Sequence, residues 1–361
     1  MNFSHYSVFL DVDAGRYTAW SIAIIGLSLN IFIICFMLWE SSCIRCCRSK
    51  RQPSSTAHIL KSPSLWLLFN LFISDLFGSI YAFILSISDV YYTHYYQARY
   101  EMNNTYLHIK NVWFTSSTCT TAQIFGRTST LMAATFTLFV AIDRLILVVY
   151  PHSKRKFTMK TSRILSVIGW IFGLAFNIGV AIFHQYSIRL KSPYTFDYFL
   201  NLCLGDFESS VVHKMLSFLQ LGYFLIVYAT VTVIYIIIIW RLRKSRLEFH
   251  SSSSSVYEKR FQIMLILISF TGVFAFYFIS ITSFTNINTH SLFRKIFALL
   301  PFTNAAIDPL LYLIFRQNEI RKKICGDRFV IHKSATIKPV SQAQETKSSR
   351  LERSAHAQIH K

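Results

Sequence analysis

The chain has 361 residues, of which 53% are apolar, 16% are aromatic and only 15% are charged, and its mean hydropathy is +0.39. This balance is too apolar for a soluble domain of this length and is typical of an integral membrane protein. The net charge of +20 lies in loops between apolar segments, which argues against a nucleic-acid-binding protein. No signal-peptide pattern opens the chain, so we expect the first apolar segment to act as its own insertion signal.

Seven apolar segments have the length needed to span a membrane. They are Tyr17–Trp39, Leu65–Ser88, Ser116–Tyr150, Ile164–Phe183, Met215–Trp240, Phe261–Ser283 and Ile296–Phe315. The stretch from Cys119 to Arg144 would be about 37 Å long as a helix, enough to cross a hydrocarbon core of about 30 Å with some tilt. We therefore predict an all-α fold, a seven-transmembrane helix bundle over 17–315.

Basic residues predict the orientation of this bundle. Of the 37 Lys and Arg residues, 28 lie in 41–61, 143–163, 241–260 and the tail after Phe315. Because cytoplasmic loops carry the excess of Lys and Arg, the N-terminus at 1–16 is expected outside the cell and the C-terminus in the cytoplasm. The expected location is the plasma membrane.

The positions of the glycosylation sequons and of the cysteines agree with this predicted orientation. The acceptor asparagines Asn2 and Asn103 fall on the predicted outer side and are candidate glycosylation sites. Of the seven cysteines, only Cys119 and Cys203 lie on that side, where an oxidising compartment would let them pair. The cysteines of the first inner loop are weak evidence for zinc, and we expect neither a metal nor a cofactor.

The cytoplasmic end is predicted to be basic and largely unfolded. Residues 316–326 resemble a short amphipathic helix on the membrane surface, where Cys325 is either a palmitoylation site or an unmodified thiol. The tail at 327–361 is polar and is expected to be disordered. The five serines Ser251–Ser255 also predict a disordered segment open to phosphorylation.

Ionisable and amide side chains inside the spans are candidate functional residues, because such groups are costly at membrane depth. Asp75 and Asp308 lie within their spans, with Asn30 in the first span and Asn304 one helical turn before Asp308. Two interpretations are open. The cluster binds a cation or shares a proton between its acids, or it is a hydrogen-bonded network that holds the helices together.

Arg127 lies eight residues after Cys119, about 12 Å from the outer end of its helix, and a guanidinium at that depth requires a partner. An acidic group of a ligand is one candidate, and Asp206, Glu208 or Asp89 of the protein itself is the other. Further candidate ligand-binding residues lie in the outer halves of the spans. They are Gln123, Thr130, Gln220, Phe274 and Tyr277.

Short motifs recur in an order that resembles the rhodopsin-like (class A) G-protein-coupled receptors. The matching positions are Gly26 with Asn30, Asn70-Leu71 with Asp75, Cys119 placed 25 residues before Arg144 of Asp143-Arg144, Trp170, Phe224 with Tyr235, Phe270 with Tyr277, and Asp308-Pro309 with Tyr312. The resemblance covers about Tyr17 to Cys325. The composition, rich in Phe and Ile, also resembles that of invertebrate chemosensory or orphan peptide receptors.

The resemblance implies a switch driven by an extracellular ligand, either a small molecule or a peptide. Asp143 would hold Arg144 at rest, and Arg144 would turn toward Tyr235, Tyr312 and a heterotrimeric G protein when the fifth and sixth helices move. Arrestin and a receptor kinase are implied partners at the Ser and Thr residues of the inner loop and tail, and membrane lipids surround the bundle. No bond is made or broken, so the protein is not expected to be an enzyme.

Several positions depart from the family pattern. Leu145 is the third residue of the Asp143-Arg144 motif, and Phe276 and Val227 replace prolines, so Gly272 would serve as a hinge. Gly126 stands where amine receptors carry an aspartate. The other departures are Phe274 for a tryptophan, Ala133 and Ala305 at sodium-ligand positions, Phe302 at the retinal lysine position and His152 after Pro151.

The main alternative is a seven-span transporter or channel. Such a protein is expected to show inverted repeats, broken helices or charges along a path, and the sequence shows none of these. A membrane enzyme would need converging His or acidic residues near an interface, and the twelve His residues are scattered.

Overall fold

The computed structural model describes residues 9, 13–46, 62–100, 112–149, 157–190, 202–204, 211–248, 254–284 and 291–324. The predicted glycosylation sites Asn2 and Asn103, the candidate partners Asp206 and Glu208, Cys325 and the tail at 327–361 lie outside these residues.

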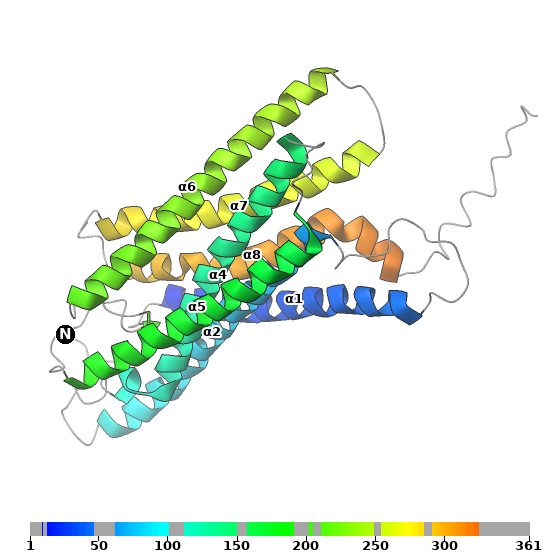
Figure 1. The fold of residues 1–361 in the computed structure, drawn as a ribbon. Helices are drawn as coiled ribbons and strands as arrows, with labels where there is room; N and C mark the ends of the chain where they lie inside the picture. The colour runs from blue at the N-terminus through cyan, green and yellow to red at the C-terminus, as the bar shows by residue number, and fades with distance from the viewer. Residues whose placement is uncertain are drawn as a thin grey trace, which may run out of the picture. The chain divides into compact units, whose positions relative to one another are not determined.

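Seven long α-helices make up this part of the chain (Figure 1). They are α1 (Asp13–Cys46), α2 (Pro63–Tyr100), α4 (Ser117–Val149), α5 (Met159–Leu190), α6 (Val211–Glu248), α7 (Ser254–Phe284) and α8 (Ser291–Ile324). Each helix contains one of the seven apolar segments found in the sequence, and the described residues contain no β-strand. The predicted all-α class is confirmed.

Length and composition qualify five of these helices to cross a membrane: the stretches Ala14–Trp39, Pro63–Tyr92, Ser117–Val149, Met159–Tyr186 and Phe218–Arg241. In α7, a shorter apolar stretch runs over Arg260–Phe276. Large apolar side chains are exposed along the helices, such as Ile171 and Phe172 on α5. Such a surface is unfavourable in water and suits contact with lipid.

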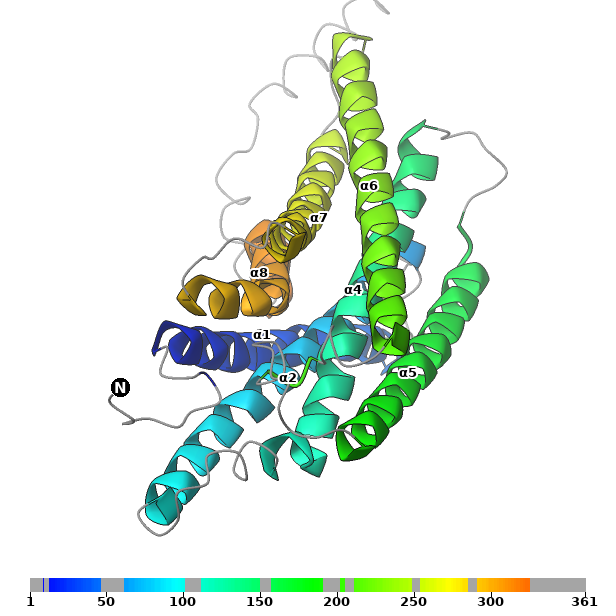
Figure 2. The ribbon, with the colours of Figure 1, turned by 90° about the vertical axis from the view of Figure 1, so that its left-hand side faces the viewer.

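Helix α4 is the central element of the packing (Figure 2). It packs against α2, α5 and α6, while α2 also packs against α1 and α5, and α6 packs against α7. The buried apolar residues form two clusters along α4. One cluster includes Cys119, and the other includes Ala141 of α4 and Tyr235 of α6. We call the end of α4 at Cys119 the disulfide end and the opposite end the Arg144 end.

Two local features differ from the sequence prediction or extend it. Ser254 and Ser255 lie in the first turn of α7, although Ser251–Ser255 was predicted to be disordered. Good helix formers follow them, and serine is favoured at helix starts, so the helix begins earlier.

The chain divides by packing after Tyr312, and the helical residues 316–324 belong to the second unit. The separate membrane-surface helix at 316–326 stays a prediction.

A proline in α8 explains one of the contacts between helices. Pro309 has no N–H, so the carbonyl of Ala305, four residues earlier, lacks its helical donor. The side-chain amide of Asn30 in α1 donates to this carbonyl over 2.7 Å, and to the Gly26 carbonyl over 2.8 Å. The amide therefore satisfies a carbonyl that would otherwise be buried without a partner, and it joins α1 to α8.

Gly26 lets the helices approach this closely. A Cβ atom built at Gly26 would collide with the Ser79 hydroxyl of α2 and lie 3.2 Å from the Ala305 carbonyl oxygen. Gly179 in α5 offers a contrast, because a Cβ atom there would meet nothing within 4 Å.

We predict that Gly26→Ala lowers the thermal stability of the purified protein, because α1 must move away from α2 and α8. Gly179→Ala is the matched control. It should leave the midpoint unchanged or raise it slightly, since alanine favours a helix by about 0.5–1 kcal/mol over glycine. Thermal unfolding in detergent checks both variants, and equal midpoints for the two would contradict the close packing at Gly26.

Candidate functional site

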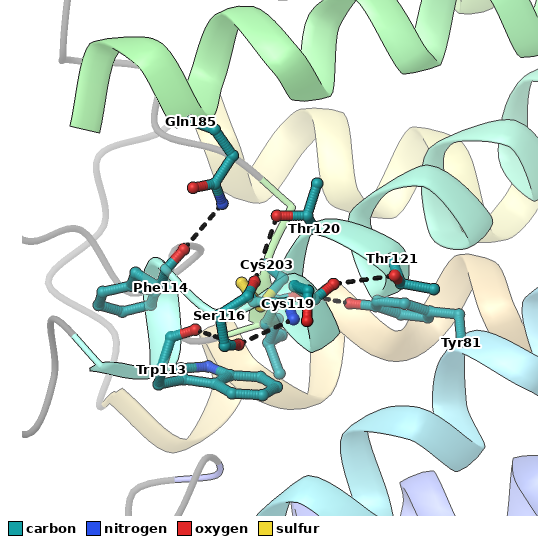
Figure 3. Close-up of a disulfide and its surroundings, with 11 residues drawn as sticks. Tyr81, Trp113, Phe114, Ser116, Cys119, Thr120, Thr121, Gln185 and Cys203 are labelled. Atoms are coloured by element: carbon teal, nitrogen blue, oxygen red, sulfur yellow. Dashed lines mark hydrogen bonds between the residues drawn. A yellow bond between two sulfur atoms is a disulfide. The ribbon is translucent and has the colours of Figure 1, made fainter. Parts of the chain in front are cut away.

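The disulfide end begins with a helix cap. Ser116 immediately precedes α4, and its hydroxyl accepts a hydrogen bond from the Cys119 N–H over 3.1 Å, as an N-cap serine does (Figure 3). Cys119 forms a disulfide with Cys203, with 5.5 Å between the two Cα atoms. The pairing predicted from the sequence is therefore confirmed. In the chain-entropy model, closing a loop of 84 residues is worth about 4–5 kcal/mol.

Three consecutive residues, Leu202 to Leu204, are fastened to the bundle by three different bonds. The Tyr81 hydroxyl of α2 donates to the Leu202 carbonyl over 2.7 Å. Cys203, which has a left-handed backbone with φ of 55°, carries the disulfide. Arg127 of α4 donates to the Leu204 carbonyl through both Nε, at 3.0 Å, and Nη2, at 2.6 Å. We call residues 202–204 the tethered segment.

The Tyr81 ring also fills the space next to Gly126. It stacks on Phe302 with 4.4 Å between ring centroids, and a Cβ atom at Gly126 would lie 2.9 Å from it. An aspartate at position 126 has no room beside this ring. The glycine at position 126 is therefore explained by the packing of the Tyr81 ring.

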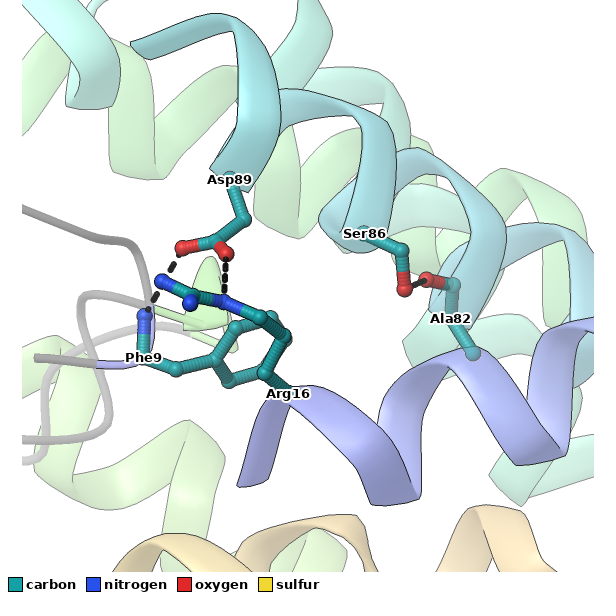
Figure 4. A network of polar contacts seen from close by, with 5 residues as sticks. All are labelled: Phe9, Arg16, Ala82, Ser86 and Asp89. Carbon is teal, nitrogen blue, oxygen red and sulfur yellow. Dashed lines mark hydrogen bonds and ion pairs between the residues drawn. The ribbon is translucent and has the colours of Figure 1, made fainter. Parts of the chain in front are cut away.

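A second polar network pins the start of the chain to the same end (Figure 4). Asp89 of α2 is fully buried, and its Oδ2 lies 2.7 Å from Nε of Arg16 in α1. Its Oδ1 accepts a hydrogen bond from the Phe9 N–H over 3.4 Å. The Phe9 side chain is only 1% exposed and belongs to the apolar cluster around Cys119. Asp89 therefore contacts both Arg16 in the first turn of α1 and the backbone of Phe9.

This network tests Asp89 as one of the candidate partners of Arg127. Asp89 is committed to Arg16, so the interpretation that Asp89 balances Arg127 is wrong. Besides the Leu204 carbonyl, Arg127 contacts the Gln220 side-chain oxygen of α6, with 3.5 Å from Nη1 to Oε1. Within the described ranges, no carboxylate lies at ion-pair distance from Arg127. Its side chain is nonetheless buried, with 9% of the residue exposed.

The other predicted ligand residues differ in burial and in their hydrogen-bond partners. Gln123 is buried, and its Nε2 has no hydrogen-bond partner in the described part of the chain. The Thr130 hydroxyl donates to the backbone carbonyls of its own helix. Phe274 is 54% exposed and stacks on Phe270 of the same helix, so placing it with the ligand residues needs correction. Residues four apart share a helix face, and Phe270 on the same face is 63% exposed as well.

The side chain of Tyr277 lies outside the described residues. Its role at a ligand site stays a prediction.

The predicted intramembrane polar cluster is buried. Asp308 accepts a hydrogen bond from the Thr271 hydroxyl of α7 over 3.3 Å. Among the described residues, three acceptor oxygens lack donors: Oδ2 of Asp75 and the Oδ1 atoms of Asn30 and Asn304. Both interpretations of this cluster, a cation or proton site and a network that joins the helices, stay predictions. Ala133 and Ala305 offer no hydroxyl ligand, so we assign no sodium ion to the cluster.

At the Arg144 end, three helices meet around one guanidinium. Arg144 and Asp143 of α4 are both buried, with 3.7 Å from Nε to Oδ2. The same Oδ2 accepts a hydrogen bond from the Ser64 hydroxyl in the first turn of α2. The Arg144 guanidinium also lies over the ring of Phe261 in α7, with 4.7 Å from Cζ to the ring centroid. This cation–π contact links α4 to α7.

The aromatic residues predicted to receive Arg144 are buried as well. Tyr235 of α6 belongs to the apolar cluster that includes Ala141, while the Tyr312 ring packs edge-on against Phe72 of α2 at 5.2 Å. Trp170 of α5 donates to the Asn70 side chain of α2 over 2.9 Å.

A sequence model of the seven-transmembrane receptors of the rhodopsin family matches residues 47–312, well over half of the chain. The chain belongs to the rhodopsin family of seven-transmembrane receptors. A search among curated proteins gives no match. The predicted membership is thus confirmed, and the receptor is a multi-pass membrane protein. The narrower resemblance to invertebrate chemosensory or orphan peptide receptors stays a prediction.

Several residues of the receptor's site were missed from the sequence. Phe261 and Ser64 carry no signal in one sequence, because an apolar residue and a serine at helix ends are common. Leu204 contributes a backbone carbonyl, which any residue has. Arg16 and Asp89 are charged residues at the outer ends of consecutive spans, and that pattern would have predicted their ion pair.

We predict that Cys203→Ser sharply lowers delivery of the receptor to the cell surface and lowers its thermal midpoint. Without the bridge, the tethered segment is held only by hydrogen bonds to Tyr81 and Arg127. Cys119→Ser and the double variant should match it, because each breaks the same bond. Cys35→Ser, at an exposed free thiol, is the control. Normal surface delivery and midpoint in Cys203→Ser would contradict the structural role of the disulfide.

Proposed function

We propose that the receptor binds an extracellular ligand at its disulfide end and, in response, activates a heterotrimeric G protein at its Arg144 end. Family membership supports the general class. The excess of Lys and Arg beside the Arg144 end supports an orientation with that end in the cytoplasm of the plasma membrane. Asn2 and Asn103 would then be available for glycosylation, and Cys325 for palmitoylation.

The observation that carries the proposal is the position of Arg144. Its guanidinium is buried beside Asp143 and against Phe261, which belong to two different helices. A G protein needs an opening between helices at this end, and separating α7 from α4 would break the contact with Phe261 and release the guanidinium. Tyr235 and Tyr312 are the partners that we propose for the released side chain.

The energy required for this step is modest. A cation–π contact contributes about 0.5–2 kcal/mol, depending on how far it is desolvated. Coupling of about 1–3 kcal/mol between two sites is typical of allosteric proteins. A ligand that binds the open arrangement of helices better by this amount would therefore shift the population of the receptor. Arrestin and a receptor kinase are proposed to act on the cytoplasmic Ser and Thr residues afterwards.

A transporter or channel is the rival function. It would need a polar path through the bundle, but the buried carboxylates Asp75 and Asp308 cluster near one level of it instead of forming a series along a path. No observation favours this rival.

We predict that Arg144→Ala abolishes nucleotide exchange on the G protein, because the guanidinium is the group that we propose meets it. Purified receptor would be reconstituted in nanodiscs with heterotrimers from each main G-protein class, and the rate of nucleotide exchange would be measured. Asp143→Asn should act in the opposite direction and raise exchange in the absence of ligand, since it weakens the hold on Arg144. If Arg144→Ala exchanges nucleotide as fast as the wild type, the proposed switch is wrong.

Phe261 provides a second test. We predict that Phe261→Leu raises exchange in the absence of ligand about fivefold, the factor expected for losing about 1 kcal/mol of cation–π attraction. Phe261→Tyr should behave like the wild type, because it keeps the aromatic face. Leucine fills a similar volume, so the comparison separates the aromatic contact from simple packing. Equal rates in the two variants would show that the ring does not hold Arg144.

A further inference from the structure

Arg127 has unusual partners for a buried arginine. Nε and Nη2 both donate to one backbone oxygen, the Leu204 carbonyl, and Nη1 reaches the Gln220 side chain only at 3.5 Å. These partners satisfy donors but carry no negative charge. Burying a cation without a counter-charge is costly, and the guanidinium is buried in α4. In the described part of the structure, the charge of Arg127 is therefore left without an opposite charge.

Asp89, a buried carboxylate at the same end of the bundle, is already paired. Asp89 pairs with Arg16 at 2.7 Å and also accepts the Phe9 N–H. It is thus not available to Arg127 without breaking a contact that holds the first helix.

A second donor lies on the same side of α4. Gln123 precedes Arg127 by four residues, so the two side chains share a helix face. Gln123 is 1% exposed, and its Nε2 has no hydrogen-bond partner among the described residues. A buried amide N–H without an acceptor costs about 1–3 kcal/mol, which an incoming acceptor would recover. Arg127 therefore lacks an opposite charge and Gln123 lacks an acceptor among the described residues, and one anionic group with two oxygens would supply both.

The shape and charge of the site favour a carboxylate. The planar guanidinium presents parallel N–H donors that match the two oxygens of a carboxylate. A single negative charge balances a single arginine, whereas a phosphate would bring a second charge. An ammonium group would be repelled by Arg127, and the space beside Gly126 is filled by Tyr81.

We propose that the ligand of the receptor carries a carboxylate that binds Arg127 in place of the Leu204 carbonyl, with Gln123 as a further donor. This inference rests on the proposed receptor function. Binding breaks the Arg127 contacts to the tethered segment, while the disulfide and Tyr81 keep residues 202 and 203 in place. The carboxylate of the ligand thus replaces the Leu204 carbonyl as the acceptor of the Arg127 hydrogen bonds. The rest of the tethered segment stays attached to the bundle.

The test measures binding without a G protein. A library of monocarboxylic acids, each paired with its own primary amide, is screened by the thermal midpoint of purified receptor in nanodiscs, at up to about 10 mM, where even an isolated ionic contact is detectable. We expect some carboxylates to raise the midpoint while their amides do not. Arg127→Gln should weaken the binding of these acids by about 30-fold or more, and Arg127→Lys by less, since it keeps the charge but loses the fork.

Two controls locate the effect. Arg163→Gln removes an exposed arginine near the Arg144 end and should leave the binding of carboxylates unchanged. Asp206→Asn and Glu208→Gln test whether either carboxylate neutralises Arg127. If one does, its variant lowers the midpoint of the receptor without ligand, tightens carboxylate binding and overturns the view that the charge awaits a ligand. Unchanged midpoints in both variants support the proposal.

Two other outcomes overturn the proposal. In one, no carboxylate in the library stabilises the wild type. In the other, carboxylates stabilise Arg127→Gln as well as they stabilise the wild type. Failure of the receptor function is seen separately, as the absence of nucleotide exchange, because the midpoints are measured with no G protein present.

Discussion

Two buried arginines on one helix set the conditions for the rest of the structure. Arg127 and Arg144 are 17 residues apart on α4, about 26 Å along the helix axis, and both lie where water cannot solvate them. Arg127 is held by a loop carbonyl, and Arg144 lies beside Asp143 and against the ring of Phe261. Neither contact is a close two-oxygen bond to a carboxylate. Each guanidinium can therefore change partners at a cost that a ligand or a protein partner can supply.

We propose that the disulfide end of the bundle around α4 is fixed and that the Arg144 end can separate. At the disulfide end, Cys203, Tyr81 and Asp89 tie the loop, α1 and α2 together by covalent, hydrogen-bonded and ionic contacts. At the Arg144 end, α7 meets α4 through the Phe261 ring, whose attraction is of the order of 1 kcal/mol. Under the proposed function, we expect movement at the Arg144 end, and a change at Arg127 would be relayed to that end.

Much of the fold could be read from the sequence, because its dominant signal is the length of apolar segments. The seven helices and the disulfide between Cys119 and Cys203 followed from hydropathy and from sidedness. Contacts that depend on three-dimensional direction did not follow. Phe274 was placed with the ligand residues, but its side chain is 54% exposed and lies on the same face of α7 as the exposed Phe270. The partner of Arg127 was sought among carboxylates, and the structure supplies the backbone carbonyl of Leu204, which a sequence cannot reveal.

The most direct test of the account is the distance between α4 and α7 at the Arg144 end. Spin labels at Leu147→Cys and Ile263→Cys, two exposed positions close to Arg144 and Phe261, would report that distance in nanodiscs once other reactive cysteines are replaced by serine. The account predicts a longer distance when nucleotide-free G protein is bound, and a partial lengthening in Phe261→Leu without it. An unchanged distance in a receptor that catalyses nucleotide exchange would contradict the release of Arg144 by movement of α7.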